Sequence, residues 1–161
     1  MWSQKKILNA VLLVANQLET ADFHKIFKIF YFADREHLAT YGRTILGDQY
    51  VAMKDGPVPS RTYDLLKAFR EDAAHIPPED RLLLEARAYT VIPKRIPDKD
   101  YLSASEIECI DRSIADNKRL TFEQLSAKSH GEAWSRATIN NEIALIDIAQ
   151  EAHASPEMLD Y

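Results

Sequence analysis

The chain has 161 residues, and its 46% apolar and 28% charged content is that of a globular protein with one core. A formal net charge of −5 does not suit a protein whose main partner is a nucleic-acid backbone. No apolar run approaches the roughly 20 residues needed to cross a bilayer, so we expect no membrane partner. The single cysteine, Cys109, cannot form an internal disulfide, which fits a reducing cytoplasm.

Two helices are predicted at the start of the chain. Apolar residues recur at intervals of three and four, which predicts a first helix over 3–18. A second helix is predicted over 22–41, with Thr20 or Asp22 as a possible cap at its start and Gly42 as its left-handed end. Residues 29–33 are apolar on nearly every side of this helix, so we expect it to be buried in the centre of the fold.

Short strands are expected in the middle of the chain. Residues 50–53 read as a strand that ends at the turn signal Asp55-Gly56. A helix is predicted over 59–72, and two further strands over 82–86 and 88–92. We therefore expect a small antiparallel sheet of two or three strands packed against helices.

The C-terminal half carries capping boxes, in which a Ser or Thr and a Glu or Gln three residues later bond each other's backbone amides. Ser103-x-x-Glu106 and Thr121-x-x-Gln124 both fit, and Ser129-x-x-Glu132 is a third match. The capping boxes and the spacing of apolar residues together predict helices at 103–116, 121–128, 131–137 and 141–153. The predicted fold class is mainly α (α+β), a bundle of about six or seven helices forming one domain over 1–161, with a helical extension and tail over 138–161.

Motifs for catalysis or cofactor binding are missing from the sequence. With four glycines, a loop that cradles a phosphate is hard to build, and pairs of cysteines for zinc are absent. Asp34-x-x-His37 places two possible metal ligands one helical turn apart, but no third ligand can be chosen. Ser129-His130 resembles a nucleophile and base, but the capping box already accounts for the serine. We expect no enzyme, no metal and no cofactor.

Asp34 has two possible roles. It lies on or beside the apolar face of its helix, where a carboxylate must find hydrogen-bond donors. It could accept bonds from backbone amides near Gly47 or Gly56, or it could be a catalytic acid or base with a raised pKa. The first role is favoured, because no second carboxylate or nucleophile has a fixed relation to it.

Two stretches of the chain carry a family resemblance. They are KIFYFADREHLATYGRTILGDQYVAMKDGPVPSRTYDLLK (28–67) and LSASEIECIDRSIADNKRLTFEQLSAKSHGEAW (102–134). Together they resemble the Panacea domain, also called the SocA-like antitoxin domain. The resemblance covers roughly residues 5–137, and no single piece of it is specific. The pieces that carry it are Tyr31–Asp34, His37-Leu38, Gly42, Ile45, Asp48–Ala52, Gly56–Pro59, Tyr63, Leu102–Glu106, Leu120-Thr121, Ser129-His130 and Trp134. Asp55 departs from the family, whose members often carry a large residue there.

The resemblance implies an antitoxin that neutralises a cognate protein toxin, encoded next to it, by direct binding. Some members of the family deliver the toxin to a AAA+ protease, and many are carried by prophages and other mobile elements. The alternatives are a metal-dependent or hydrolytic enzyme using Asp34, His37 or His130, and a DNA-binding autorepressor.

Within that reading, some residues are expected to contact the partner and others to hold the fold. The partner-binding candidates are Arg35, Glu36, His37, Tyr50, Lys54 and Asp55. The structural candidates are Asp34, Gly56, Pro57, Pro59, Tyr63, Ser129 and Trp134. The sequence leaves open the toxin, its target and the oligomeric state.

Overall fold

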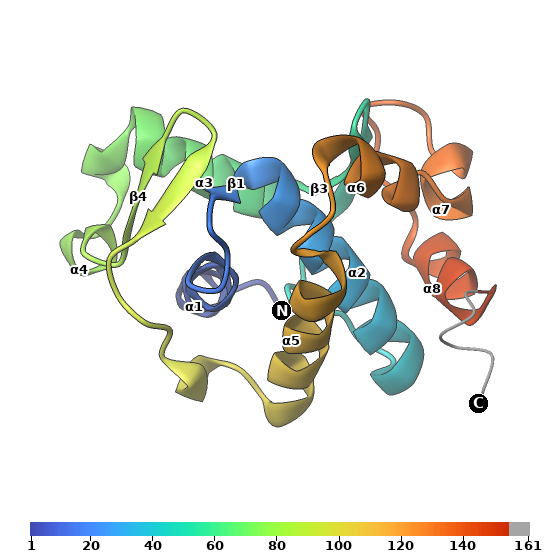
Figure 1. Cartoon of the computed structure of the whole chain (residues 1–161), viewed down its shortest axis with the longest axis horizontal. Coiled ribbons are helices and arrows are strands. Elements are labelled where there is room, and N and C mark those ends of the chain that lie inside the picture. Colours follow the sequence, from blue (N-terminus) through green and yellow to red (C-terminus); the bar gives the residue numbers. More distant parts are fainter. Residues whose placement is uncertain (155–161) are drawn as a thin grey trace.

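Helix α2 (Phe23–Tyr41) runs through the middle of the computed structural model, which describes residues 1–154 (Figure 1). Every residue from Ile26 to Asp34 is buried, as the all-round apolar pattern predicted. The helix begins where the Asp22 carboxylate accepts a hydrogen bond from the Lys25 amide at 2.8 Å. It ends at Gly42, whose φ of +78° is the left-handed cap that glycine adopts without strain.

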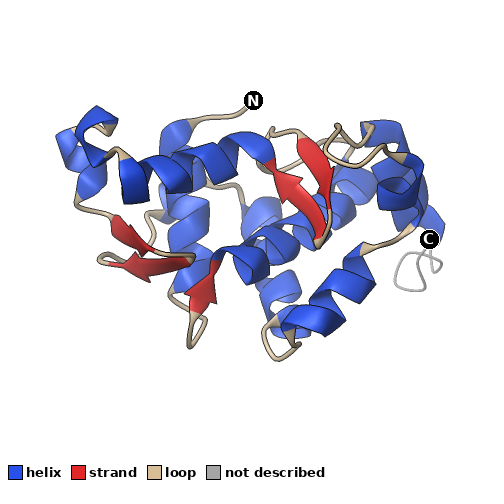
Figure 2. Cartoon of the chain, turned by 90° about the horizontal axis from the view of Figure 1, so that it is seen from above, coloured by secondary structure: helices blue, strands red, loops and turns tan. Residues whose placement is uncertain are grey.

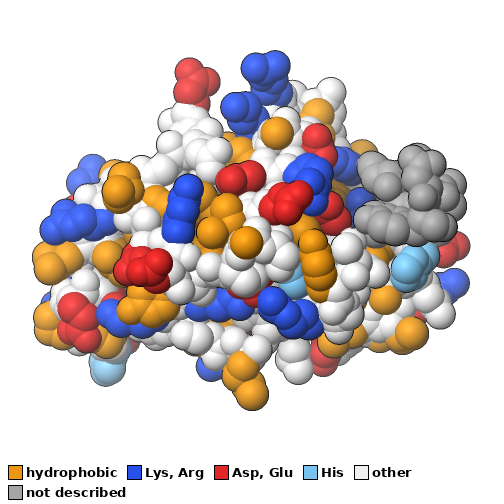
Figure 3. Space-filling model, turned by 90° about the horizontal axis from the view of Figure 1, so that it is seen from below, with side chains coloured by type: hydrophobic (Ala, Val, Ile, Leu, Met, Phe, Trp, Pro, Cys, Tyr) orange, Lys and Arg blue, Asp and Glu red, His pale blue; other side chains and the backbone are white. Residues whose placement is uncertain are grey.

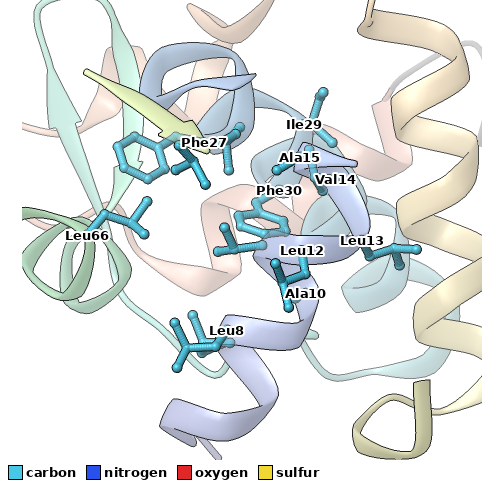
Figure 4. Close-up of a cluster of buried hydrophobic side chains, with 14 of the residues drawn as sticks. Leu8, Ala10, Leu12, Leu13, Val14, Ala15, Phe27, Ile29, Phe30 and Leu66 are labelled. Carbon is cyan, nitrogen blue, oxygen red and sulfur yellow. The ribbon is translucent and has the colours of Figure 1, made fainter. Parts of the chain in front are cut away.

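Two helices pack against α2 in the main hydrophobic core. Helix α1 (Gln4–Ala15) is buried continuously from Ile7 to Ala15, and Figure 4 shows side chains of α1 gathered with Phe30 of α2. Helix α5 (Ala104–Asn117) packs along α2, and the Ser113 hydroxyl donates to the Ile29 carbonyl at 2.7 Å. Burying a large apolar side chain contributes about 1.5–3 kcal/mol, so this cluster is the main source of stability.

The strands form two small antiparallel sheets, shown in red in Figure 2. The first has the order β1 (Ala21–Asp22), β5 (Thr90–Pro93), β4 (Leu84–Arg87). The second is a hairpin of β2 (Tyr50–Met53) and β3 (Gly56–Pro59), with Ala52 opposite Pro57. The small antiparallel sheet is confirmed, but its strands are divided between two sheets, and β1 and β3 were not predicted.

Helix α3 (Ser60–Glu71) follows β3 directly, with Pro59 at its cap position. The proline side chain has no oxygen that could accept a hydrogen bond from the first amides of the helix. Asp48, which lies earlier in the chain, accepts these bonds instead. The Asp48 carboxylate accepts from the amides of Arg61 at 3.0 Å and Thr62 at 2.8 Å. A 3₁₀ turn, Ala73–His75, and the short helix α4, Pro78–Arg81, lead on to β4.

The two strongest capping boxes are formed. Ser103 and Glu106 bond reciprocally at the start of α5, and Thr121 and Gln124 do so at the start of α6 (Phe122–Ser129). The third predicted box is wrong. Ser129 is the buried last residue of α6, and its hydroxyl donates to the Ser126 carbonyl at 2.9 Å.

The chain ends in two further helices within the described part, α7 (Glu132–Arg136) and α8 (Leu145–Ala154). Helix α8 starts later than predicted, because residues 140–143 pair with β2 instead of continuing a helix. The Asn140 amide donates to the Ala52 carbonyl at 2.6 Å, and the Ile143 amide to the Tyr50 carbonyl at 2.7 Å. The rest of the predicted tail, 155–161, lies outside the described residues. Within 1–154 no helix is long and apolar enough to span a bilayer.

Candidate functional site

Asp34 is an acceptor inside the core. One carboxylate oxygen accepts from the amides of Ile45 at 2.5 Å and Leu46 at 3.3 Å, and the other accepts from the Tyr50 hydroxyl at 2.6 Å. Burial raises the pKa of Asp34 to about 6, although these three hydrogen bonds act to lower it. The bonds run to the loop before Gly47, one of the two places expected, and they tie that loop and β2 to α2.

His37 and Tyr50, two of the expected partner contacts, are fully buried, so a role for either in binding stays a prediction. The two ring nitrogens of His37 lie 2.8 Å from the Arg43 carbonyl and 2.9 Å from the Ser105 hydroxyl. A residue three positions after Asp34 shares its helix face, and that face is covered by the following loop and the start of α5. Neither side chain presents a surface to a partner in this conformation.

Arg35 and Glu36 are half-buried and are engaged by other parts of the same chain. The Arg35 guanidinium lies 3.2 Å from the Glu151 carboxylate and over the ring of Phe32. The Glu36 carboxylate lies 2.6 Å from Arg112 on α5. A partner would have to compete with these ion pairs, and a role for either residue in binding stays a prediction.

Lys54 and Asp55 are exposed on the turn between β2 and β3, and they lie at the edge of a groove. The groove has a volume of about 550 Å³, which is within the range of roughly 300–1,000 Å³ found for ligand sites. It is built by α2, the β2–β3 hairpin, α3, the β4–β5 turn and the start of α6. Its lining consists of Asp22, Phe23, His24, Phe27, Lys28, Met53, Lys54, Asp55, Gly56, Val58, Tyr63, Tyr89 and Phe122.

Aromatic rings dominate the lining of the groove. Phe23 and Phe27 pack against the ring of Tyr63, with centroids 6.3 and 5.5 Å apart, so these three form a fixed wall. At the mouth, Tyr89 is 64% exposed and Phe122 is 48% exposed. Sequence reasoning missed both, because exposure of a single aromatic residue leaves no periodic signal.

Lys28 also lines the groove, although it is only 1% exposed. Its ammonium donates to the Pro57 carbonyl at 2.9 Å, and burial lowers its pKa to about 8. Gly56 has a φ of +119°, and a Cβ there would overlap Lys28 Cε and the Ser129 hydroxyl. The Gly56-Pro57 pair is thus shaped around the lysine.

The Ser-His-x-x-x-Trp end of the resemblance also packs against the hairpin. Trp134 donates its indole N–H to the Met53 carbonyl at 2.8 Å, and its ring stacks on His130 with centroids 3.8 Å apart. Trp134 is therefore a link between α7 and the end of β2. His130 Nε2 has no hydrogen-bond partner within the described residues.

The polar groups named for the enzyme alternative do not come together. Within residues 1–154 no three His, Cys, Asp or Glu side chains are placed to hold a metal ion. Both oxygens of Asp34 and both nitrogens of His37 are taken by neighbours in the chain. The Cys109 thiol is buried, which raises its pKa to about 11. On the face seen in Figure 3, charged side chains of both signs are interspersed with apolar ones, without a continuous basic surface.

The fold and groove define a mainly helical protein whose exposed aromatic residues line a preformed surface depression. The chain belongs to the family described as antitoxin SocA-like, Panacea domain, which matches residues 26–135. This confirms the resemblance and supports an antitoxin role, while α1 lies before the matched region. No curated protein and no solved structure matches the chain.

Proposed function

We propose that the chain is an antitoxin that neutralises a cognate protein toxin by binding it directly, and that the aromatic groove is the contact surface. Membership of the antitoxin family supports the role. The observation that carries the choice of surface is the exposure of Tyr89 and Phe122 at the mouth of a groove with an aromatic wall. Exposed tyrosine and phenylalanine beside a preformed pocket are typical anchors of protein interfaces.

The groove is suited to binding because its wall is already ordered. Phe23, Phe27 and Tyr63 hold each other by edge-to-face packing, and Phe122 stacks on His24 with centroids 3.9 Å apart. A partner that enters therefore orders few side chains, which reduces the entropic cost of association. Lys54 and Asp55, two of the partner contacts expected from the sequence, lie at the edge of the groove. There they would fix how the partner is aligned in it.

Binding can neutralise a toxin in two ways. The antitoxin can cover the toxin's working surface, or it can deliver the toxin to a AAA+ protease. The half-life of the toxin separates the two, because occlusion leaves it stable and delivery shortens it. Both routes require the direct contact that is proposed.

The test is co-expression with the neighbouring open reading frame, whose product should arrest growth when expressed alone. The wild-type chain should relieve the arrest and co-purify with the toxin. Tyr89→Ser and Phe122→Ser should each weaken relief and co-purification. Tyr101→Ser is a matched control, since Tyr101 is 44% exposed and does not line the groove.

Relief of arrest by the wild type that is unchanged in both groove variants would assign the contact to another surface. Failure of the wild type to relieve arrest by its neighbour would contradict the antitoxin role for that pair. Circular dichroism melts of the variants show whether any loss reflects unfolding rather than binding.

A further inference from the structure

Lys28 is a buried cation with no carboxylate in contact among the described residues: Asp55 and Asp22 act on it only from a distance, and they raise its pKa less than burial lowers it. Its ammonium has three N–H groups, one of which donates to the Pro57 carbonyl. The two others have no acceptor within residues 1–154, and no carboxylate there lies within ion-pair distance of the nitrogen. Buried charges in folded proteins are as a rule paired, because an isolated charge loses its hydration without compensation.

The position of this cation gives it access to a ligand. Lys28 lies on α2 one turn after His24 and next to Phe27, and all three line the groove. Its stem is held by the close approach of Gly56, so the ammonium cannot swing out to bulk water without moving the hairpin. A group that fills the groove therefore lies against this fixed, desolvated lysine and beside aromatic rings.

The other charged groups of the groove do not neutralise Lys28 by contact. Asp22 accepts the Lys25 amide as the cap of α2, and Asp55 is exposed on the hairpin turn, where water screens it. Lys54, next to Asp55 in the sequence, is exposed as well. Burial, and to a smaller extent the nearby Lys28, lower the pKa of His24 below its ordinary value. The groove thus has a carboxylate at its rim, but it has none in contact with the cation at its buried end.

We infer that the groove receives a segment of the toxin in which an aromatic or large aliphatic side chain stands next to a glutamate or aspartate, whose carboxylate pairs with the Lys28 ammonium. This inference rests on the proposed function for the identity of the partner. The aromatic wall takes the apolar side chain, and the carboxylate accepts the two unfilled N–H groups. A charge pair shielded from water is stronger than one on the surface, so the acid is the specific element of the motif.

The test uses two peptides that differ only in charge, acetyl-Gly-Phe-Glu-Gly-amide and its Gln counterpart, titrated into the purified full chain and followed by NMR. The Glu peptide should bind at least tenfold more tightly than the Gln peptide, with shifts at the groove residues. In Lys28→Met, which keeps the length of the side chain, that preference should vanish. Lys99→Met, a matched change at an exposed lysine that does not line the groove, should retain it.

A second readout follows from titration. The preference of the wild type for the Glu peptide should decline above about pH 8, where the free Lys28 loses its proton, and Lys28→Met should show no such decline. Equal binding of the two peptides, a preference that survives Lys28→Met, or no binding of either peptide would overturn the inference. The peptide titration and the co-expression test are independent experiments. The chain can relieve toxin arrest even if the groove does not prefer the Glu peptide, and it can prefer the Glu peptide even if it does not relieve arrest.

Discussion

The Tyr50 hydroxyl donates a 2.6 Å hydrogen bond to the Asp34 carboxylate, and the two fully buried side chains join strand β2 to helix α2. Because Asp34 also accepts two amides from the loop before Gly47, it fixes the first residue of β2 and the segment that leads to it. The hairpin that begins there carries one edge of the groove. Asp34 therefore affects partner binding indirectly, by holding the hairpin that forms this edge in place.

Replacing Asp34 tests this role. Asp34→Ala leaves three buried donors without an acceptor and should lower the free energy of unfolding by about 1–3 kcal/mol. At pH 7, Asp34→Asn should stay close to the wild type, because the amide oxygen can accept the two backbone N–H groups and the amide nitrogen can donate to Tyr50. Urea unfolding followed by circular dichroism measures both. An alanine variant that melts like the wild type but no longer relieves toxin arrest would contradict a structural role.

The pH dependence of stability should reveal the raised pKa of Asp34. Its pKa of about 6 in the fold lies above the ordinary value of 3.8, so the folded state binds the proton more tightly than the unfolded chain. The stabilising contribution is complete below about pH 3.8 and is lost as the pH rises through 6. Relative to Asp34→Asn, the wild type should therefore lose on the order of 2–3 kcal/mol between pH 4 and pH 7. A constant difference between the two proteins over this range would contradict it.

Glu106 should behave in the opposite direction. Burial raises the pKa of its carboxyl, but hydrogen bonds from Lys6, the Ser103 amide and Arg43 outweigh burial and bring it to about 2. Its contribution is present above about pH 4.5 and is lost as the pH falls through 2. Glu106→Gln should therefore be less stable than the wild type at pH 7, and the gap should narrow on acidification. Thermal melts between pH 2 and pH 7 measure the gap, and a gap that widens in acid would rule out this assignment.

Features that depend on neighbours in the sequence could be predicted, and the capping boxes show why. Ser103 and Thr121 each bond an amide three residues away, so the signal lies within four residues. Ser129 matched the same pattern but folded as the end of α6, because its helix continues into the residues that were expected to cap the next one. A local rule cannot distinguish these two outcomes.

Features that depend on distant segments could not be predicted. Strand β3 was missed because two prolines in four residues argue against a strand, yet it pairs as the partner of β2. Ile143 shares the helical spacing of the apolar residues that follow it, but the amides of Asn140 and Ile143 donate to β2, about ninety residues earlier in the chain. In the groove, the turn residues Lys54 and Asp55 were chosen from the sequence, whereas Tyr89 and Phe122 reach it only through the tertiary fold.

The two formed caps should have equal and modest effects on stability. Ser103→Ala and Thr121→Ala each remove the acceptor of one helix N-terminal amide, and each should cost about 1 kcal/mol. Ser135→Ala is a control, since this serine lies inside the short α7 and makes a single bond back to Gly131, so its loss should cost less than about 0.5 kcal/mol. Denaturant unfolding of the three variants should give this order, and an equal loss in Ser135→Ala would show that the caps add nothing specific.

A pair of glycines compares backbone strain alone, at Gly42, with strain and crowding together, at Gly56. Gly42 and Gly56 both have positive φ, but a Cβ at Gly42 meets nothing within 4 Å. Gly42→Ala should therefore cost only the strain of a left-handed alanine, about 1 kcal/mol. Gly56→Ala adds a collision with Lys28 and Ser129, so its unfolding free energy should fall by at least about twice as much, and peptide binding in the groove should weaken. Denaturant unfolding and the peptide titration measure the two effects, and equal losses in both variants would mean that the hairpin is not packed onto Lys28 as the structure has it.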